Sequence, residues 1–393
     1  MTTQNTDEDR PYRICTRCIM DTTDPEITFD EQGRCCHCRT YDAQIRCLCW
    51  DERQSAAMLP ALIERIRASG KGREYDCIIG VSGGVDSTYV AWKVKELGLR
   101  PLAVHMDNGW NSALAVTNIH KVLNKLGIDL YTEVLDWEEF RDLQLSFLRA
   151  STPDSEIPTD HAITAVLMQV AAKHKINYII GGSNIRSEGI LPRAWSQGIR
   201  DWRYIHGVHK RFGTVPLKTF PHFTMLGFVL ARTLGKHKWI NILNYIDYNK
   251  TEAMRLLQDE LGWVYYGGKH YESVYTRFFQ AYILPRKFGA DKRRAHLSTL
   301  VCSGEMSRDE ALETIKEPIC PPELLREDKD FVIKKLGITE SEFDKIMALP
   351  RKTIADYPAY ENGTLLKLGR LLYRAPRRLT LLLRGGAEGT RRA

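Results

Sequence analysis

Residues 78–94 read IIGVSGGVDSTYVAWKV, and this stretch decides the fold. An apolar run typical of a buried strand leads into a turn with two glycines, and a helical pattern follows the turn. The turn is not a Walker A loop, GxxxxGK followed by serine or threonine, because no lysine follows its glycines until Lys93. It carries instead the hydroxyl groups of Ser82 and Ser87 and the carboxylate of Asp86.

The chemistry of this turn suits a phosphate group. Glycines let backbone N–H groups approach a ligand closely, and the start of a helix favours an anion. We therefore expect Ser82, Gly83, Gly84 and Ser87 to bind phosphate. A carboxylate beside a polyphosphate needs a cation between the two, so Asp86 is predicted to lie on the Mg2+ side of the ligand.

Strand-like and helical patterns alternate around this loop. Runs typical of buried strands occur at 75–81, 101–106, 129–135 and 176–182. Helical patterns occur at 55–70, 86–98 and 112–127, and on either side of 151–160. The alternation predicts an α/β protein with a parallel sheet and helices on both faces, whose ligand binds at the carboxyl ends of the strands. Near residue 195 the alternation ends, and helical segments follow.

The six residues SGGVDS (82–87) resemble the loop of the PP-loop ATP pyrophosphatases. In that family the loop holds the β- and γ-phosphates, and ATP is split into AMP and pyrophosphate while a carbonyl oxygen of a second substrate is adenylated. The resemblance implies a PP-loop sheet, of the adenine nucleotide alpha hydrolase-like kind, that uses ATP and Mg2+. The alternative is that the glycines form only a turn between strand and helix.

The same resemblance implies an adenine contact at the end of the second strand, in VHMDNGW. The candidates there are Val104, Met106 and Asp107. The alternative is that Asp107 and Asn108 merely form a turn, which their short polar side chains favour.

A later strand end, in IIGGSNIRSEG, resembles the glycine-containing segment that lies near ATP and metal in relatives. The resemblance implies that Gly182 and Asn184 bind ATP and that Glu188 takes part in catalysis. A role for Glu188 in capping a helix, or on the surface, is the alternative.

Seven of the ten cysteines lie between Cys15 and Cys49, which a metal site explains better than a disulfide framework does. Two CxxC pairs form the spacing C-x2-C-x16-C-x2-C, with Cys15, Cys18, Cys35 and Cys38. This spacing predicts a zinc ribbon with a structural Zn2+. Cys36 blurs the register because it competes with Cys38 in the sequence. Three further residues could substitute as ligands, but we favour free side chains for them: His37, Cys47 and Cys49.

The charge pattern argues against a nucleic-acid surface and a membrane span. The formal net charge is +7, but the tail from Arg370 to Ala393 has seven arginines and one acid, so it supplies +6 and leaves about +1 for the rest. No run approaches the roughly 20 apolar residues that cross a bilayer. The first residues carry acids where a signal peptide needs bases, so we expect a cytoplasmic protein.

Several motifs together resemble the N-acetyl sugar amidotransferase family, which includes WbpG and PseA. They are residues 12–38, the SGGVDS loop, PTDHAI (158–163), residues 179–195 and residues 267–298. The resemblance implies that ATP activates the acetamido oxygen of a nucleotide-linked sugar, and that ammonia then displaces AMP to leave an acetamidino group. A product for surface polysaccharide, such as O antigen, is implied as well.

Basic residues in the second half are candidates for the charged substrates. Lys269 is expected to be catalytic, and His270 and Arg277 to meet pyrophosphate or substrate. If residues 267–279 form a helix, His270, Ser273 and Arg277 share one face of it. Weaker candidates for the sugar nucleotide are Trp195, Arg200, His206, Lys292 and Arg293. A solvated helix face, a basic surface cluster and core packing of Trp195 are the alternatives.

The sequence offers no glutaminase nucleophile, because position 2 is Thr2 and the early cysteines are assigned to the metal. We therefore expect ammonia from a separate glutaminase subunit, with or without a cyclase-like tunnel subunit, or else from solution. The alternative function is a PP-loop enzyme that modifies tRNA. Sulfur transfer to a tRNA base needs nearby thiols, and no cysteine occurs between Cys77 and Cys302. A zinc-ribbon binding protein without enzymatic activity is a more distant alternative.

Three domains are expected. Residues 1–55 form the zinc ribbon, and residues 56–235 form the PP-loop domain. Residues 236–393 form a mostly helical region that completes the substrate site and ends in the basic tail, 370–393. The identity of the sugar is left open between a uridine-linked diacetamido uronic acid and a nonulosonic acid.

Overall fold

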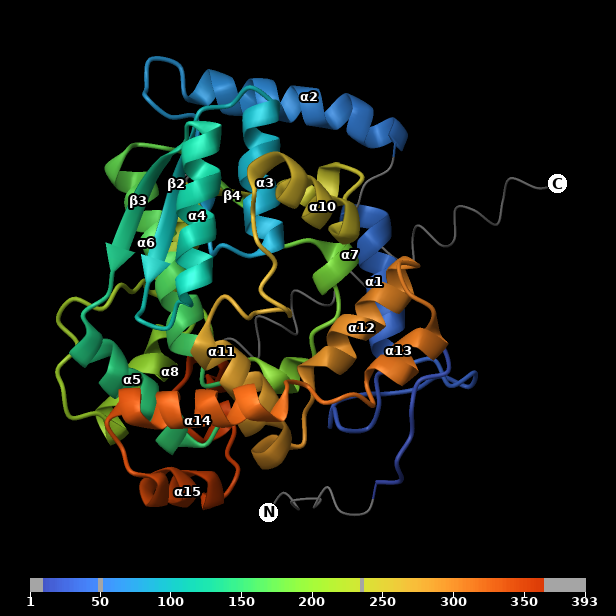
Figure 1. Cartoon of the computed structure of the whole chain (residues 1–393), viewed down its shortest axis with the longest axis vertical. Helices are drawn as coiled ribbons and strands as arrows, with labels where there is room; N and C mark the ends of the chain where they lie inside the picture. The colour runs from blue at the N-terminus through green and yellow to red at the C-terminus, as the bar shows by residue number, and fades with distance from the viewer. Residues whose placement is uncertain (1–9, 49–51, 234–236, 364–393) are drawn as a thin grey trace.

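The computed structural model describes residues 10–48, 52–233 and 237–363. Its centre is a five-stranded parallel sheet in the order β3-β2-β1-β4-β5 (Figure 1). The strands are β1 (Cys77–Gly80), β2 (Pro101–Asp107), β3 (Asp129–Val134), β4 (Tyr178–Gly181) and β5 (Lys238–Asn241). The predicted α/β class is confirmed. The sequence does not predict β5, because this short edge strand is mostly exposed and lacks a buried apolar run.

Helices pack on both faces of the sheet. One face is covered by α2 (Glu52–Ser69), α3 (Val85–Glu96), α4 (Ala113–Leu126) and α10 (Lys250–Leu261). The other face is covered by α6 (Ile157–Lys173). Ile79 of β1 packs with the first group and its neighbour Ile78 with α6, because successive residues of a strand point to opposite faces. Both faces are therefore apolar, as in other parallel sheets.

A helical layer lies beyond the carboxyl ends of β2 and β3 (Figure 1). It contains α5 (Trp137–Ala150), α8 (Trp202–Phe212), α11 (Val274–Phe278), the π-helix η4 (Phe279–Phe288), α14 (Pro322–Leu336) and α15 (Glu340–Ala348). Aromatic side chains such as Phe147, Tyr204 and Phe278 are buried in its core. The helical C-terminal part expected from the sequence is therefore confirmed.

The remaining elements of the described residues are shorter or peripheral. They are α1 (Cys36–Leu48), α7 (Ile185–Glu188), η2 (Arg193–Trp195), α9 (Met225–Thr233), η3 (Ile242–Tyr245), α12 (Lys292–Ser303), α13 (Arg308–Thr314), η5 (Ile354–Asp356) and η6 (Tyr360–Asn362).

The N-terminal module, described over residues 10–48, contains two isolated β-bridges: Ile14 with Asp21 and Phe29 with Cys35. Helix α1 begins directly after them, whereas the sequence shows no helical periodicity before residue 55. The helix is hard to predict because its residues are largely polar and Tyr41 is its main buried apolar anchor. The basic tail, 370–393, lies outside the described residues.

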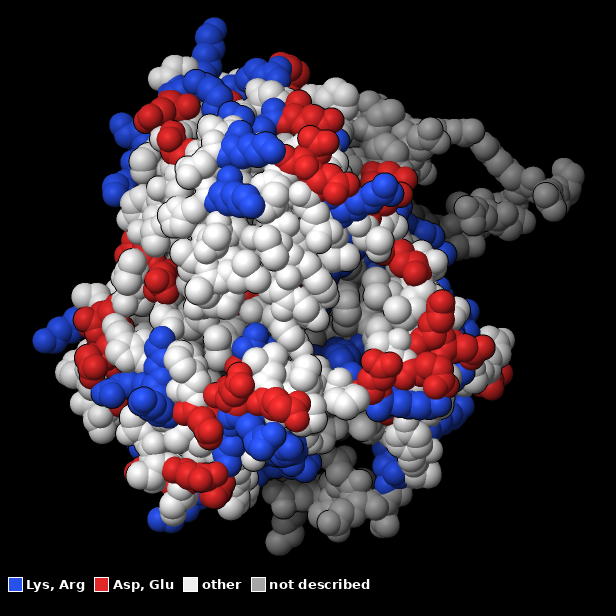
Figure 2. Space-filling view, in the orientation of Figure 1, with Lys and Arg blue, Asp and Glu red and all other residues white. Residues whose placement is uncertain are grey.

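Charged side chains of both signs are interspersed on the face seen in Figure 2. That face has no continuous basic surface, in keeping with the charge balance of the sequence. An uncharged area lies over α4 and the loop between α10 and α11, where Val264 and Tyr265 are exposed (Figure 2). Among the helices of the described residues, none combines the length and apolar character that a membrane crossing requires.

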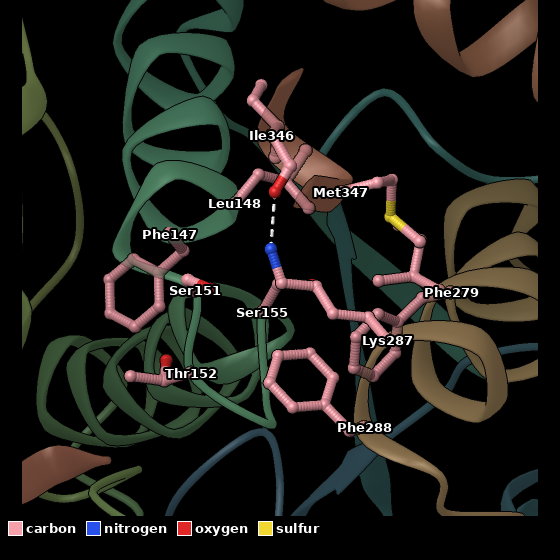
Figure 3. Close-up of a pocket in the computed structure, with 11 residues that line it drawn as sticks. Phe147, Leu148, Ser151, Thr152, Ser155, Phe279, Lys287, Phe288, Ile346 and Met347 are labelled. Carbon is pink, nitrogen blue, oxygen red and sulfur yellow. Dashed lines mark hydrogen bonds between the residues drawn. The ribbon is translucent and has the colours of Figure 1, made fainter. Parts of the chain in front are cut away.

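The helical layer contains a small hollow of about 10 Å3 that is lined in part by Lys287 (Figure 3). Lys287 lies in the π-helix η4, and its Nζ donates a hydrogen bond to the carbonyl of Ile346. Aromatic and aliphatic side chains surround most of the hollow, and hydroxyl groups lie on one side: Ser151, Thr152 and Ser155. Burial lowers the pKa of Lys287 to about 8, and Arg351 adds to the effect.

Candidate active site

The glycine loop between β1 and α3 is shaped for a close ligand. Gly83 has a φ of +82°, and a Cβ there would lie 2.8 Å from the carbonyl oxygen of Ala115, so only glycine fits. The indole of Trp263 donates to the carbonyl of Gly83 at 3.0 Å and fixes the turn. Helix α3 begins at Gly84 without a side-chain cap, which leaves the N-terminal end of a 12-residue helix for an anion.

The two serines of the loop face one another. The hydroxyl oxygens of Ser82 and Ser87 lie 3.2 Å apart, and Ser87 donates to the carbonyl of Gly84 at 3.1 Å. Ser82 is exposed and Ser87 partly buried, so both hydroxyl groups are placed where a phosphate held by the loop would meet them.

Asp86 lies in the first turn of α3 and accepts a hydrogen bond from the buried hydroxyl of Tyr248. Burial raises the pKa of Asp86 and Glu188 adds to the rise, while Lys250 opposes it. Burial also raises the pKa of Tyr248, which therefore stays a hydrogen-bond donor. The sequence does not single out Tyr248 or Lys250, because neither belongs to a motif and both are far from Asp86 along the chain.

Glu188, at the end of α7, pairs with Lys269. Lys269 Nζ lies 3.1 Å from Glu188 Oε1 and 3.3 Å from Nδ1 of His296. Burial opposes ionisation of Glu188, but Lys269 and His270 outweigh it and lower its pKa. Burial, with Lys269 adding, holds the pKa of His296 well below its usual range, so the imidazole is neutral at pH 7. His296 also bonds the carbonyl of Ser187 at 2.9 Å.

The segment 267–273 is a loop and not a helix, which corrects the prediction of one helical face for His270, Ser273 and Arg277. Gly267 and His270 have positive φ values of 94° and 64°, and Ser273 is the N-cap of α11. A helix cannot form there because the backbone pairs with the segment after β2, through the bridge between Asn111 and Ser273.

This pairing brings a further carboxylate to the loop. The amide of Ser112 donates to the carbonyl of Glu272 at 2.8 Å. Glu272 Oε1 would lie 3.6 Å from a Cβ on Gly84, and His270 Nδ1 lies 3.6 Å from the same oxygen. Glu272 Oε2 is buried and has no hydrogen-bond partner among the described residues. Sequence reasoning missed Glu272, although it lies within the segment that carries Lys269 and His270.

At the end of β2, Asp107 forms the turn that was the alternative to an adenine contact. Its carboxylate accepts from the amide of Gly109 at 2.8 Å and from Asn111 Nδ2 at 3.1 Å. Val104 is buried in the sheet, and Met106 is partly buried. An open hollow of about 300 Å3 lies beside this turn, lined by Asp107, Gly109, Val134, Leu135, Trp137 and Lys335. The adenine contact stays a prediction.

The end of β4 comes close to the glycine loop. A Cβ on Gly182 would lie 3.1 Å from the backbone of Asp86 and Ser87, so a larger residue would separate the two segments. Asn184 caps α7 by accepting from the amide of Ser187 at 2.8 Å, which occupies its carbonyl oxygen. A contact of Asn184 with ATP is untested.

Lys292, the first residue of α12, lies among three carboxylates. Its Nζ is 3.7 Å from Glu156 Oε2, and Asp154 and Asp160 are also close enough to raise its pKa. Burial, with Asp154 and Glu156 adding, raises the pKa of Asp160 to about 8. Asp160 lies in the first turn of α6, whose N-cap is Glu156.

The other basic and aromatic candidates have structural partners or lie apart. Arg277 pairs with Asp328 at 2.6 Å, and Arg293 pairs with Asp291 at 2.8 Å. Trp195 is 2% exposed in the core of the helical layer. The guanidinium of Arg200 lies 5.1 Å from the ring of Phe228, and His206 is exposed on α8. Their predicted contacts with substrate remain predictions.

The four predicted zinc ligands come together. The sulfur atoms of Cys15, Cys18, Cys35 and Cys38 all lie within 4.8 Å of one another, and all four residues are fully buried. Three of the pairs are 3.7 Å apart. Sulfurs about 2.3 Å from a tetrahedral Zn2+ lie about 3.8 Å from each other. The group therefore fits a single metal ion.

Two other cysteines, Cys36 and Cys302, differ in how they lie relative to this group. The Cys36 sulfur accepts from the amide of Thr28 at 3.5 Å and lies outside the group of four. The side chains of Cys47 and Cys49 lie outside the described residues. The sulfur of Cys302 lies 3.7 Å from that of Cys38. Sequence reasoning missed this neighbour because Cys302 belongs to no CxxC pair.

The sheet order and the glycine loop after the central strand define an α/β protein with a helix start open to an anion. Residues 272–372 match the family described as LPS biosynthesis protein WbpG-like, C-terminal domain. The predicted resemblance to WbpG is thereby confirmed for this part of the chain. A comparison with curated proteins finds no match.

Solved structures give weak likenesses. NMN synthetase from Francisella tularensis is 18% identical with a TM-score of 0.27, covering 35% of this chain and 57% of that chain. A predicted subunit of tRNA methyltransferase from Methanocaldococcus jannaschii is 13% identical with a TM-score of 0.27, covering 46% and 72%. NH3-dependent NAD synthetase from Campylobacter jejuni is 14% identical with a TM-score of 0.29, covering 72% and 97%. At these TM-scores the likenesses carry no argument.

Proposed function

We propose that the chain is the synthetase subunit of an ATP-dependent amidotransferase. It would adenylate the acetamido oxygen of a nucleotide-activated N-acetyl sugar, and ammonia would then displace AMP. One observation carries the proposal: the WbpG-like segment begins at Glu272 and includes His296, and both residues lie at the glycine loop or at the ion pair beside it. The WbpG-like part and the phosphate loop thus contribute to one site.

The charges of the site suit the release of pyrophosphate. Loop amides and the start of α3 would bind the β- and γ-phosphates, and Lys269 and Lys250 would balance their negative charge. Asp86, Glu188 and Glu272 are the carboxylates available to a Mg2+ ion, whose chemistry when bound is to neutralise the phosphate oxygens. The absence of a Walker lysine fits an enzyme that holds a departing pyrophosphate.

The proposed reaction balances in two steps. The acetamido oxygen attacks the α-phosphorus of ATP, the bond to the β-phosphate breaks, and pyrophosphate leaves. The resulting imidate has AMP on its oxygen. Ammonia adds to the imidate carbon, and the carbon–oxygen bond breaks to release AMP and leave an acetamidino group. Adenylation is needed because an amide carbonyl is a poor electrophile.

The finer features of the proposal follow from the resemblance to WbpG. Ammonia would come from a partner glutaminase, and the product would serve surface polysaccharide such as O antigen. The family description names LPS biosynthesis, which supports this context. The uridine-linked diacetamido uronic acid is the substrate we favour over a nonulosonic acid precursor.

The test is an incubation of the purified chain with ATP, Mg2+, an ammonium salt and a panel of nucleotide-linked N-acetyl sugars. We expect AMP and pyrophosphate in equal amounts, and a sugar product about 1 Da lighter because oxygen is replaced by NH. Formation of ADP would contradict the PP-loop chemistry. Turnover that depends on added tRNA, and not on any sugar, would favour the tRNA-modifying alternative.

A further inference from the structure

A fifth thiol lies beside the group of four cysteines. The sulfur of Cys302 is 3.7 Å from that of Cys38, the same distance that separates Cys38 from Cys35 within the group. Cys302 is at the end of α12, far along the chain from the N-terminal module. It is half-buried, whereas the four cysteines of the group are fully buried.

The position of Cys302 is fixed by a set of contacts between α12 and the N-terminal module. The amide of Ile19 donates to the hydroxyl of Ser298 at 3.2 Å, and Arg294 donates to the carbonyl of Ile19 at 2.8 Å. Arg294 also pairs with the fully buried Asp21 at 3.1 Å. These bonds hold the helix that carries Cys302 against the peptide between the two CxxC pairs.

The spacing of the five sulfurs distinguishes four resident ligands from one neighbour. Only Cys15, Cys18, Cys35 and Cys38 are all within 4.8 Å of one another among the described residues. Zn2+ in structural sites is almost always bound by four ligands in a tetrahedron, so the fifth sulfur has no vacant position. It lies next to Cys38 at the distance that two ligands of one ion have, so a small side-chain rotation would bring it to the metal if Cys38 left.

We propose that Cys302 is a reserve ligand of the metal site that can take the place of Cys38. In this exchange the bond between Cys302 sulfur and the metal forms, the bond to Cys38 breaks, and the proton of the Cys302 thiol passes to Cys38. Charge and ligand number are conserved. With Cys302 bound, the metal joins α12 directly to the N-terminal module.

The sequence would favour a different substitute. Cys36 is two positions from Cys38, but its sulfur accepts from the amide of Thr28 and is outside the group of four. Cys36 and Cys302, as substitutes for Cys38, therefore make opposite predictions for the zinc content of double variants, which allows a direct test.

The experiment measures zinc per chain, by elemental mass spectrometry, in full-length variants purified with zinc. We expect Cys38→Ser and Cys302→Ser each to keep about one zinc, the number that one four-thiolate site binds. We expect Cys38→Ser/Cys302→Ser to lose it and Cys38→Ser/Cys36→Ser to keep it. Cys15→Ser, which has no reserve thiol beside it in the proposal, should lose the metal. Loss of zinc from Cys38→Ser alone, or from the variant that lacks Cys36 and Cys38, overturns the proposal.

If Cys38→Ser does not fold, Co2+ binding and alkylation of the wild-type chain test whether Cys302 is a resident ligand of the metal. The wild-type chain, loaded with Co2+, has thiolate-to-metal absorption that reports the four ligands. We expect iodoacetamide to modify Cys302 while that absorption and the bound metal are unchanged. Modification of Cys38 with Cys302 protected, or loss of metal as Cys302 reacts, would show that Cys302 is a resident ligand and overturn the proposal.

Discussion

The ammonium group of Lys269 lies 3.1 Å from the carboxylate of Glu188, and this ion pair joins the loop before α11 to the end of α7. Both side chains are about one quarter to one third exposed. Both therefore remain accessible to a ligand. Lys269 can exchange Glu188 for another anion, and Glu188 can exchange Lys269 for another cation. A phosphate would attract Lys269, and a metal ion would attract Glu188.

Replacing Lys269 with methionine should impair catalysis without unfolding the protein. The ion pair is partly exposed, so the free energy of unfolding should fall by only about 1 kcal/mol when the pair is lost. Loss of one charged group that stabilises the transition state should lower the rate of AMP release about 100-fold. Lys316→Met is the matched control, since Lys316 is exposed and pairs with Glu313. Normal AMP release by Lys269→Met would contradict the assignment.

Asp86→Asn should abolish turnover and leave the fold intact. Burial raises the pKa of Asp86, so its charge opposes folding, and asparagine can still accept the hydrogen bond of Tyr248. We expect the free energy of unfolding to stay equal or to rise, while AMP release falls by about 100-fold or more. Asp259→Asn, at an exposed ion pair with Arg255 on α10, is the control. Full turnover of Asp86→Asn at any Mg2+ concentration would exclude a metal-side role.

Local patterns in the sequence predicted those parts of the fold whose structure depends on neighbouring residues in the chain. The glycine loop, the buried strands and the two CxxC pairs each have a short-range signal, because backbone conformation and ligand spacing restrict the residues there. The four cysteines and the loop are accordingly found where they were expected.

The rest depends on contacts between distant segments, which single-sequence patterns do not contain. Lys250 and Glu272 reach the site because α10 and the loop before α11 pack against the glycine loop. The helix considered over 267–279 is wrong for residues 267–273 for a similar reason: three- and four-residue spacing fits a helix, but pairing of Ser273 with Asn111 imposes a loop before α11. Cys302 could not be predicted because its neighbour Cys38 is in another module.

Arg277→Ala should destabilise the protein strongly and leave substrate binding unchanged. Arg277 makes two bonds of 2.6 and 2.7 Å to Asp328, whose side chain is 4% exposed. Removing one partner of a buried pair leaves the other charge unpaired, which costs about 3–5 kcal/mol. Arg326→Ala, at an exposed pair on the same helix α14, should cost less than about 1 kcal/mol. Urea unfolding gives both values.

The prediction that Arg277 bound substrate can be tested on the same variant. If Arg277 is structural, the KM for ATP of the folded Arg277→Ala protein should match that of the wild type. A raised KM with unchanged stability would instead restore the substrate-binding role.

Lys287→Met should stabilise the protein at pH 7. Burial lowers the pKa of Lys287 to about 8, whereas an unfolded lysine has a pKa of about 10.4, so the shift of roughly two units opposes folding by about 3 kcal/mol. Methionine fills a similar volume without a charge. Loss of the hydrogen bond to Ile346 offsets about 1–2 kcal/mol, so the net gain should be about 1–2 kcal/mol.

The pH dependence gives an independent measurement of the same effect. Between about pH 8 and 10.4 the unfolded chain holds the proton on Lys287 and the folded chain does not, so the free energy of unfolding rises with pH across that window. In Lys287→Met this contribution should be absent, so the advantage of the variant at pH 7 should disappear as the pH rises and should reverse by about pH 10. Urea unfolding of both at pH 7, 8.5 and 10 measures it, with Lys316→Met as an exposed control. A difference that stays constant over this range would mean that Lys287 keeps its ordinary pKa in the hollow.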